Sequence, residues 1–223
     1  DAYTMLCDSY RDEVVEALGL DATKAHVYAI ENAENAVEDV CYKKENVILF
    51  CGRFENWSKR IDRLLRIWAR VEPLLADWKL VLVGDGRDGK MLRGLAEDLK
   101  LQRVSFEGMQ KNVSEYYRKA SVVCLTSETE GWPLALTEGQ AQGCIGVAFG
   151  ATSGIKEILD GGCGFTVTAF DEAEFAQTLI KLASLDEDRI MEMRMNGVRK
   201  RAEYAPEAIA DKWKKLFDML VMQ

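Results

Sequence analysis

The sequence predicts an α/β fold in which a Rossmann-like parallel sheet carries helices on both faces. Three observations favour this fold. Short apolar runs typical of buried strands recur along the chain, and amphipathic helical segments stand between most of them. Several of the apolar runs lead directly into a glycine-containing turn and then into a helix start. Such alternation is typical of a parallel sheet that is covered on both sides.

The expected elements follow from the periodicity of the apolar residues. Strands are expected at residues 25–30, 47–51, 79–83, 103–106, 121–125, 144–149 and 164–167. Helices are expected at residues 60–72, 90–99 and 134–141, and a final helix opens at Pro206. The helix at 60–72 has one apolar stripe and ends before Pro73, which cannot continue it. The final helix carries an apolar stripe made of Trp213, Leu216, Phe217 and Leu220.

Length and charge limit the organisation and the partners. The 223 residues suffice for one sizeable core with appendages. We expect a lead-in at residues 1–45, a core at 46–170 and a helical tail at 171–223. A net charge of −8 argues against a nucleic-acid partner, because nucleic-acid binders usually carry a basic face. No apolar run is long enough to span a bilayer, so no transmembrane segment is expected.

The cysteines and the single histidine limit the chemistry. None of the six cysteines is in CxxC spacing, so we expect free thiols in a reducing compartment and no metal site. His26 is the only histidine, and a structural role is expected for it in its strand-like segment. A mechanism that needs a histidine base or a histidine-bound metal is therefore disfavoured.

The segment from Ser127 to Glu138 is the strongest functional signal. Glu130 and Glu138 bracket a turn that contains Gly131 and Pro133, between the expected strand at 121–125 and the expected helix that begins near Leu134. A helix start at the carboxyl edge of a sheet favours phosphate, because it offers unpaired N–H groups and a positive dipole end. A phosphate cradle with a carboxylate on either side suits a ligand that has both phosphates and hydroxyls. A nucleotide-sugar is such a ligand.

Two cations follow an earlier strand. Gly52 and Arg53 come after the expected strand at 47–51, and Lys59 stands at the opening of the next helix. Cations around a helix start at the carboxyl edge of a sheet predict a diphosphate clamp. Further arginines continue at helical spacing, and for these we expect a solvated basic face: Arg63, Arg66 and Arg70.

Two other glycine-rich turns leave alternatives open. Residues 84–89 match the pattern GxGxxG, and Glu107 follows at the distance typical of a dinucleotide fingerprint. The motif indicates either an NAD-dependent oxidoreductase or a tight turn near a nucleotide, and it does not lie in the first strand–helix unit. In the second turn, at residues 150–157, small residues permit close backbone approach, while Ser153 is alternatively an N-cap.

These motifs occur in a fixed order along the chain. They are Gly52-Arg53, Lys59, Val83-Gly84-Asp85-Gly86, Phe106-Glu107-Gly108, Ser127-x-x-Glu130-Gly131-x-Pro133-x-x-x-x-Glu138, Gly143 and Gly154-x-x-Glu157. The ordered set resembles the carboxyl-terminal half of a GT-B glycosyltransferase, and most of all glycosyltransferase family 4, the retaining group with a Glu-x7-Glu motif. The likeness runs along the whole chain and is weakest before residue 45.

The resemblance implies a donor site and assigns roles to its residues. Glu130 would be catalytic, at the transferred sugar, and Glu138 would bind the ribose hydroxyls. Arg53 and Lys59 would bind the donor diphosphate beside Gly52. The backbone of Gly131, Pro133 and Leu134 would hold sugar and phosphate, and residues from Phe106 to Met109 would contact the base. Gly139 stands where the family often has alanine, and it would either weaken its helix or allow close approach to the ribose.

The resemblance also implies partners and a setting. The donor would be a nucleotide-diphospho-sugar, used without a cofactor or a metal, and the acceptor a glycan or a lipid. A first domain that supplies most of the acceptor site would be missing from this chain, and the final helix would cross back toward it. The setting would be the cytoplasmic side of polysaccharide synthesis, with membrane-surface attachment through the missing half as an open alternative. A non-catalytic binding module and a nucleotide-sugar epimerase also remain open, although the lack of further histidines disfavours the epimerase.

Overall fold

The computed structural model describes residues 2–21, 26–34, 37 and 39–221. Its main sheet has six parallel strands in the order β5-β4-β3-β6-β7-β8. The predicted parallel α/β fold is therefore confirmed. The strands are β3 (Glu45–Cys51), β4 (Lys79–Val83), β5 (Val104–Gly108), β6 (Ala120–Leu125), β7 (Ile145–Phe149) and β8 (Gly164–Val167).

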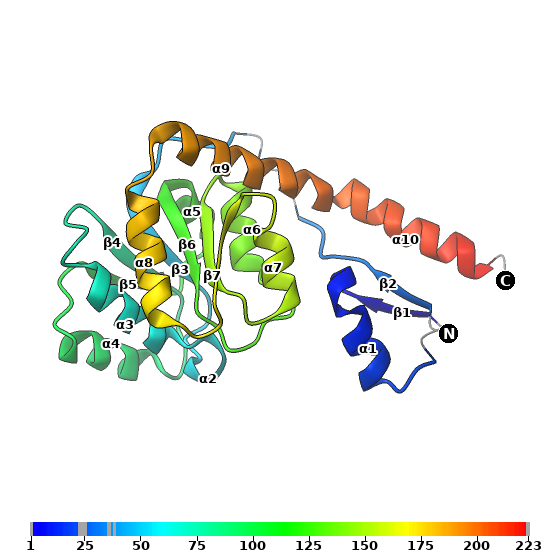
Figure 1. Ribbon diagram of the computed structural model, residues 1–223, viewed down its shortest axis with the longest axis horizontal. Helices are drawn as coiled ribbons and strands as arrows, with labels where there is room; N and C mark the ends of the chain where they lie inside the picture. The colour runs from blue at the N-terminus through cyan, green and yellow to red at the C-terminus, as the bar shows by residue number, and fades with distance from the viewer. Residues whose placement is uncertain (1, 22–25, 35–36, 38, 222–223) are drawn as a thin grey trace.

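Helices cover both faces of this sheet (Figure 1). On one face pack α3 (Ile61–Val71), α4 (Gly89–Asp98) and α8 (Glu172–Ala183). On the other face pack α5 (Ser114–Lys119), α6 (Leu134–Ala141) and α7 (Ser153–Leu159). The short helix α2 (Asn56–Lys59) precedes α3, and the helical tail consists of α9 (Glu187–Arg201) and α10 (Pro206–Val221).

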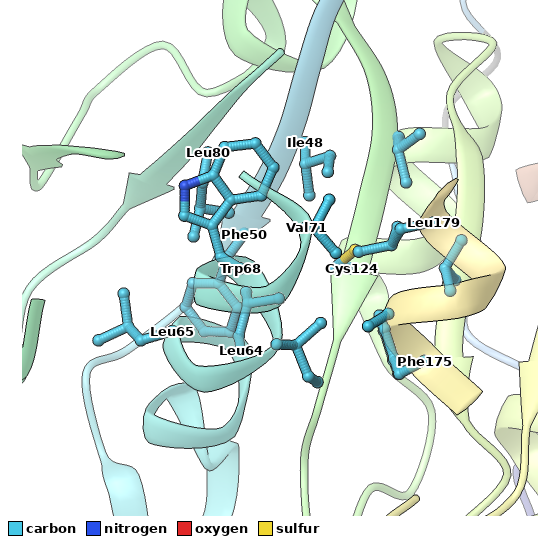
Figure 2. Packing of buried hydrophobic residues seen from close by; sticks show 14 of the residues in the cluster. Ile48, Phe50, Leu64, Leu65, Trp68, Val71, Leu80, Cys124, Phe175 and Leu179 are labelled. Atoms are coloured by element: carbon cyan, nitrogen blue, oxygen red, sulfur yellow. The ribbon is translucent and has the colours of Figure 1, made fainter. Parts of the chain in front are cut away.

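The strands are apolar throughout because both of their faces are buried. On β3, Ile48 and Phe50 belong to one buried cluster, and Val47 and Leu49 belong to the cluster on the opposite face. Figure 2 shows the first cluster, in which side chains of α3 and α8 pack against β3 and its neighbours. The aromatic ring of Trp68 fills the space between α3 and the sheet.

Gly139 on α6 has a packing role that the sequence did not reveal. A β-carbon at this position would lie 2.7 Å from the side chain of Val123 on β6. The glycine therefore lets α6 pack closely on the sheet. The interpretation that it allows approach to a ribose is wrong, because the close neighbour is the strand.

The first part of the chain forms a separate small sheet. β1 (Ala2–Met5) pairs in parallel with β2 (His26–Ala29), and the connection holds a short 3-10 helix, η1 (Asp8–Tyr10), and α1 (Arg11–Ala17). We call residues 2–21 and 26–29 the lead-in unit; Figure 1 places it to one side of the main sheet, beneath α10. The strand expected at residues 25–30 thus exists, but in a second sheet, and residue 25 lies outside the described residues. An apolar alternation does not specify which partner strand it pairs with.

The apolar stripe of α10 is only partly buried. Leu216 is 5% exposed, whereas Trp213 is 38% and Phe217 is 55% exposed. Between this helix and the lead-in unit lies an apolar cavity of about 480 Å³ lined by Met5, Ile30 and Trp213, among others. Within residues 2–21, 26–34, 37 and 39–221, no helix has the length and the apolar character needed to cross a bilayer. The six cysteines are all free.

Candidate functional site

The strand order places a topological switch point in the middle of the sheet, between β3 and β6. β3 and β6 are hydrogen-bonded neighbours although they are not consecutive in the main sheet, so their following loops diverge to opposite faces. Ligands of open α/β sheets bind at such a switch point, outside the carboxyl ends of the strands. The loops after β3 and β6 contain Lys59 and Glu130, respectively. The fold therefore brings together two segments that are far apart in sequence.

Backbone contacts hold these two loops against each other. The Glu128 backbone N–H donates to the Ser58 carbonyl oxygen at 2.7 Å. The Thr126 hydroxyl donates to the Arg60 carbonyl oxygen at 3.0 Å. Because both contacts are made by main-chain or short side-chain atoms at the end of a buried strand, the separation of the loops is fixed.

Lys59 and Glu130 form an ion pair at this junction. The Lys59 Nζ atom lies 2.6 Å from Glu130 Oε1, and the Ser127 hydroxyl donates to the same oxygen at 2.6 Å. The side chains of Lys59 and Glu130 are 25% and 10% exposed. Neither contact uses Glu130 Oε2. Ser127 was not predicted as a site residue, although it stands in the motif Ser127-x-x-Glu130.

A second cluster of ion pairs joins the loop after β6 to the start of α3. Arg60 binds Asp62 at 3.0 Å and Glu128 at 3.1 Å, and Arg63 also binds Glu128, at 2.8 Å. The expectation of a solvated basic face is wrong for Arg63, whose side chain is 12% exposed. Arg66 and Arg70 are 38% and 52% exposed, as expected, but both also reach Glu172, and Arg66 pairs with Asp62. Helical spacing placed the arginines on one side of α3, but it did not reveal the carboxylates from other elements that face them.

Asp62 makes this cluster sensitive to pH. Burial opposes ionisation of Asp62, but hydrogen bonds from Arg60 and Arg66 outweigh burial and lower its pKa from 3.8 to about 2. A carboxyl group whose pKa is lowered by folding stabilises the folded protein at pH values above its ordinary pKa. This stabilisation is lost as the pH falls through the pKa that the group has in the folded state. The contribution at neutral pH is about 2 kcal/mol, since a pKa difference of one is worth about 1.4 kcal/mol.

We expect Asp62→Asn to lower the free energy of unfolding by about 2 kcal/mol at pH 7. The difference from the parent protein is expected to be constant above about pH 5 and to shrink below pH 4, as the parent carboxyl begins to be protonated. Urea unfolding from pH 7 down to pH 3 measures it. A difference that does not change over this range would show that the charge of Asp62 is not the source of the stability.

The start of α6 lies beside Glu130. Pro133 is the residue that immediately precedes the helix, and Leu134 is its first residue. The first N–H groups of a helix have no partner within it, so the α6 start offers donors to an anion. Gly131 and Leu134 are exposed at this end. The backbone from Gly131 to Leu134 therefore leads directly into the start of α6, and its role in binding sugar and phosphate stays a prediction.

The other residues predicted to bind the donor, Arg53, Phe106 and Met109, have different surroundings from the Lys59–Glu130 pair. Arg53 pairs with Glu55 at 3.3 Å, and its side chain is 77% exposed. Phe106 packs edge-on against Phe54, with ring centroids 6.1 Å apart, and the Arg93 guanidinium stacks on its other side at 4.6 Å. Its ring is therefore engaged in packing. Met109, just beyond the end of β5, is 81% exposed and is available to a ligand.

Glu138 lines a cavity that also reaches Leu134 at the start of α6 and that is not lined by Lys59 or Glu130. This cavity, of about 380 Å³, lies between α5, α6 and the segment after the lead-in unit. Its polar lining includes Glu34, Ser114, Tyr117, Glu138 and Gln142. Glu34 and Ser114 could not be predicted as lining residues, because neither belongs to a recognisable motif.

Two buried groups at this cavity have shifted pKa values. Burial raises the pKa of Tyr117 strongly, and the neighbouring Cys51 thiol and Glu138 carboxylate raise it further. Burial also raises the pKa of Glu34, although hydrogen bonding to Thr137 and the charge of Arg201 oppose the rise. Among the described residues, no atom is in hydrogen-bonding geometry with the Tyr117 hydroxyl. A ligand with hydroxyl groups in this cavity would find acceptors in Glu34 and Glu138.

The glycines of the GxGxxG segment serve loop packing. A β-carbon on Gly84 would lie 1.9 Å from the Gly52 carbonyl oxygen, and one on Gly86 would lie 2.7 Å from the Phe54 carbonyl oxygen. The loop after β3 thus rests directly on the loop after β4. These contacts account for both glycines without a dinucleotide, so the oxidoreductase alternative loses the motif on which it rested.

The first turn of α7 makes a similar close contact. A β-carbon on Gly154 would lie 2.5 Å from the Gly131 carbonyl oxygen, so a glycine is required where α7 meets the Glu130 loop. Thr152 is the N-cap residue and Ser153 is the first helical residue. The alternative in which Ser153 is the N-cap is therefore wrong by one position.

Comparison with known proteins gives relatives that are glycosyltransferases. A family model described as glycosyl transferases group 1 matches residues 45–184. The amylovoran biosynthesis glycosyltransferase AmsD of Erwinia amylovora is 30% identical over 189 residues, which are 84% of this chain and 52% of that protein. An α-1,4-N-acetyl-D-galactosaminyltransferase of Campylobacter jejuni, named for a diphospho-undecaprenol-linked substrate, is 30% identical over 179 residues, 80% of this chain and 49% of that protein.

A solved structure has the same fold at low sequence identity. The pneumococcal O-GlcNAc transferase GtfA, crystallised with UDP and GlcNAc, superposes with a TM-score of 0.86 at 17% identity, over 100% of this chain and 46% of that chain. The chain spans about half the length of the curated relatives described above.

Proposed function

The chain belongs to the group 1 glycosyltransferases, and from this premise we propose that it is the donor-binding half of a retaining glycosyltransferase that uses a nucleotide-diphospho-sugar. The resemblance drawn from the sequence motifs is confirmed at the level of the family. The observation that carries the proposal is the Lys59–Glu130 pair, seated at the switch point between β3 and β6 beside the start of α6.

The site has the charges that sugar transfer from a diphosphate requires. Negative charge develops on the leaving diphosphate, and Lys59, Arg53 and the start of α6 would stabilise it. Positive charge develops at the anomeric carbon, and the Glu130 carboxylate would stabilise it, as carboxylates do in glycoside hydrolysis. Lys59 has three protons, so its Nζ atom is able to bind Glu130 and a phosphate oxygen at once. No metal has a step in this proposal, and retained configuration is adopted from the family.

Glu138 and its cavity supply the nucleoside end of the proposed site. Its carboxylate would accept hydrogen bonds from the ribose hydroxyls, and Met109 would contact the base at the end of β5. The UDP in the crystal structure of pneumococcal GtfA supports a nucleoside diphosphate as the class of ligand. The site leaves the base and the sugar open.

A further domain would complete the enzyme on the side of the lead-in unit. A two-stranded parallel sheet is too small to be stable alone, and parallel sheets are normally covered on both faces. The exposed residues Trp213 and Phe217 of α10 flank the same region. We propose that the acceptor half docks here and that a glycan or lipid-linked saccharide binds in the cleft between the halves, at the cytoplasmic side of polysaccharide synthesis.

Calorimetric titration of the protein with UDP, GDP and ADP in the presence of a chelator tests the donor site. We expect saturable binding of one nucleotide, and we expect Lys59→Ala to weaken it by about 1.5–3 kcal/mol, the usual worth of a hydrogen bond to a charged group. Loss of Lys59 also leaves Glu130 as an unpaired negative charge that opposes the diphosphate. The matched control is Lys79→Ala, which removes an exposed lysine at the start of β4, at the opposite edge of the sheet.

The outcomes separate the alternatives. Equal affinities for the parent protein and Lys59→Ala would remove Lys59 from the site. Binding that appears only when magnesium replaces the chelator would contradict the metal-free mechanism. In the complete protein, a failure to bind any of the three nucleotides, together with no consumption of a sugar donor, would indicate a non-catalytic module.

A further inference from the structure

The hydroxyl group of Tyr10 connects three backbone groups of the candidate site. Its oxygen lies 3.1 Å from the carbonyl oxygens of both Glu130 and Gly131, which share its single proton as acceptors. It accepts a hydrogen bond from the backbone N–H of Gly154 at 3.2 Å. One hydroxyl thus ties the loop after β6 to the first turn of α7.

Tyr10 reaches this place from outside the main sheet. It lies at the end of η1, in the lead-in unit, more than a hundred positions before Glu130 in the sequence. The neighbouring residue Ser9 makes a second contact with the core, from its hydroxyl to Glu157 at 3.3 Å. We therefore expect the lead-in unit to keep a contact with the core when the Tyr10 hydroxyl alone is removed.

The surroundings of Tyr10 are shaped for this contact. A β-carbon on Gly154 would lie 3.1 Å from the Tyr10 hydroxyl oxygen and 2.5 Å from the Gly131 carbonyl oxygen. Any larger residue would push the first turn of α7 away from the loop. The absence of a side chain at this position lets the tyrosine and both backbone segments approach one another.

The Glu130 side chain and its backbone are held by different elements. Lys59 and Ser127 fix the carboxylate, and Tyr10 fixes the carbonyl oxygens of Glu130 and Gly131. The backbone position matters because a carboxylate must be placed within a fraction of an ångström to stabilise a transition state. Without the hydroxyl, the loop between Glu130 and Pro133 would lose its anchor on this side.

We propose that Tyr10 is a positioning residue that sets the backbone of the Glu130–Gly131 turn and so couples the lead-in unit to the catalytic centre. This inference rests on the proposed function of Glu130. It assigns to the lead-in unit a part in positioning the catalytic loop, because the unit contributes one of the contacts that orient the loop. Tyr10 would act through the backbone of this loop.

The experiment compares Tyr10→Phe with Tyr28→Phe in the complete enzyme, with turnover measured as release of nucleoside diphosphate from the sugar donor. The Tyr28 hydroxyl belongs to the same unit but donates to Met219 on α10, at 3.4 Å. We expect Tyr10→Phe to lower kcat about tenfold, while KM for the donor and the calorimetric affinity for the nucleotide stay within twofold. Tyr28→Phe is expected to leave all three unchanged.

A second variant changes the same contact from α7. Gly154→Ala keeps the Tyr10 hydroxyl but crowds both this hydroxyl and the Gly131 carbonyl oxygen, and we expect a similar fall in kcat with the nucleotide affinity retained. Turnover within twofold of the parent in both variants would overturn the inference. So would losses of kcat and nucleotide affinity in proportion to a loss of folded protein, measured by thermal unfolding.

Glu130→Gln, measured in parallel, separates the two levels of the proposal. Lost turnover in Glu130→Gln together with full turnover in Tyr10→Phe overturns the inference alone. Full turnover in Glu130→Gln overturns the role of Glu130, and with it the positioning role of Tyr10.

Discussion

Glu130→Gln in the complete enzyme is expected to lower kcat by about a hundredfold or more, with the affinity for the nucleoside diphosphate changed by less than about threefold. The substitution keeps the size of the side chain and keeps an oxygen for Lys59 and Ser127, which lie 2.6 Å from Glu130 Oε1. It removes the negative charge that would stabilise the positive anomeric carbon. Ground-state binding depends mainly on the phosphates, so the loss falls on the transition state.

Glu128→Gln is the matched control for this prediction. Glu128 lies in the same loop, but its carboxylate pairs with Arg60 and Arg63, at 3.1 and 2.8 Å, rather than with Lys59. We expect its loss to reduce stability slightly and to leave kcat within about threefold. Initial rates of nucleoside diphosphate release, with folded fractions matched by thermal unfolding, provide the comparison. Equal losses of kcat in the two variants would mean that loop stability, rather than the Glu130 charge, limits turnover.

The position of the site could be predicted because it depends on strand direction. Lys59 and Glu130 each follow an apolar strand, and the carboxyl ends of parallel strands meet at one edge. Glycine turns and the Pro133 helix start mark the same edge in the sequence. Local patterns therefore sufficed to place the loops, and the pairing of β3 with β6 then brought the two charges together.

The connecting contacts could not be predicted in this way. Tyr10 and Glu34 come from the first part of the chain, and nothing in their own segments indicates which loop or cavity they approach. Ser127 is a partial exception, since it stands three positions before Glu130 within the motif. The contacts of the Phe106 ring with Phe54 and Arg93 were likewise not predictable from its own segment. Side-chain partners depend on tertiary approach, which periodicity does not encode.

Gly84→Ala is expected to have the largest effect on stability, about 3 kcal/mol or more in the free energy of unfolding. Its φ is +137°, a conformation that residues with a side chain rarely adopt, and a β-carbon would overlap the Gly52 carbonyl oxygen at 1.9 Å. The clash is with backbone, so the loop that leads to Lys59 must move, and we expect nucleotide affinity to fall with stability.

Gly94→Ala is the control: no atom lies within 4 Å of its β-carbon on α4, and it should stabilise by about 0.5–1 kcal/mol. Urea unfolding of both variants measures the contrast. Equal stabilities would show that the two loops are not packed as closely as this contact requires, and that the Lys59 loop is free to shift without loss.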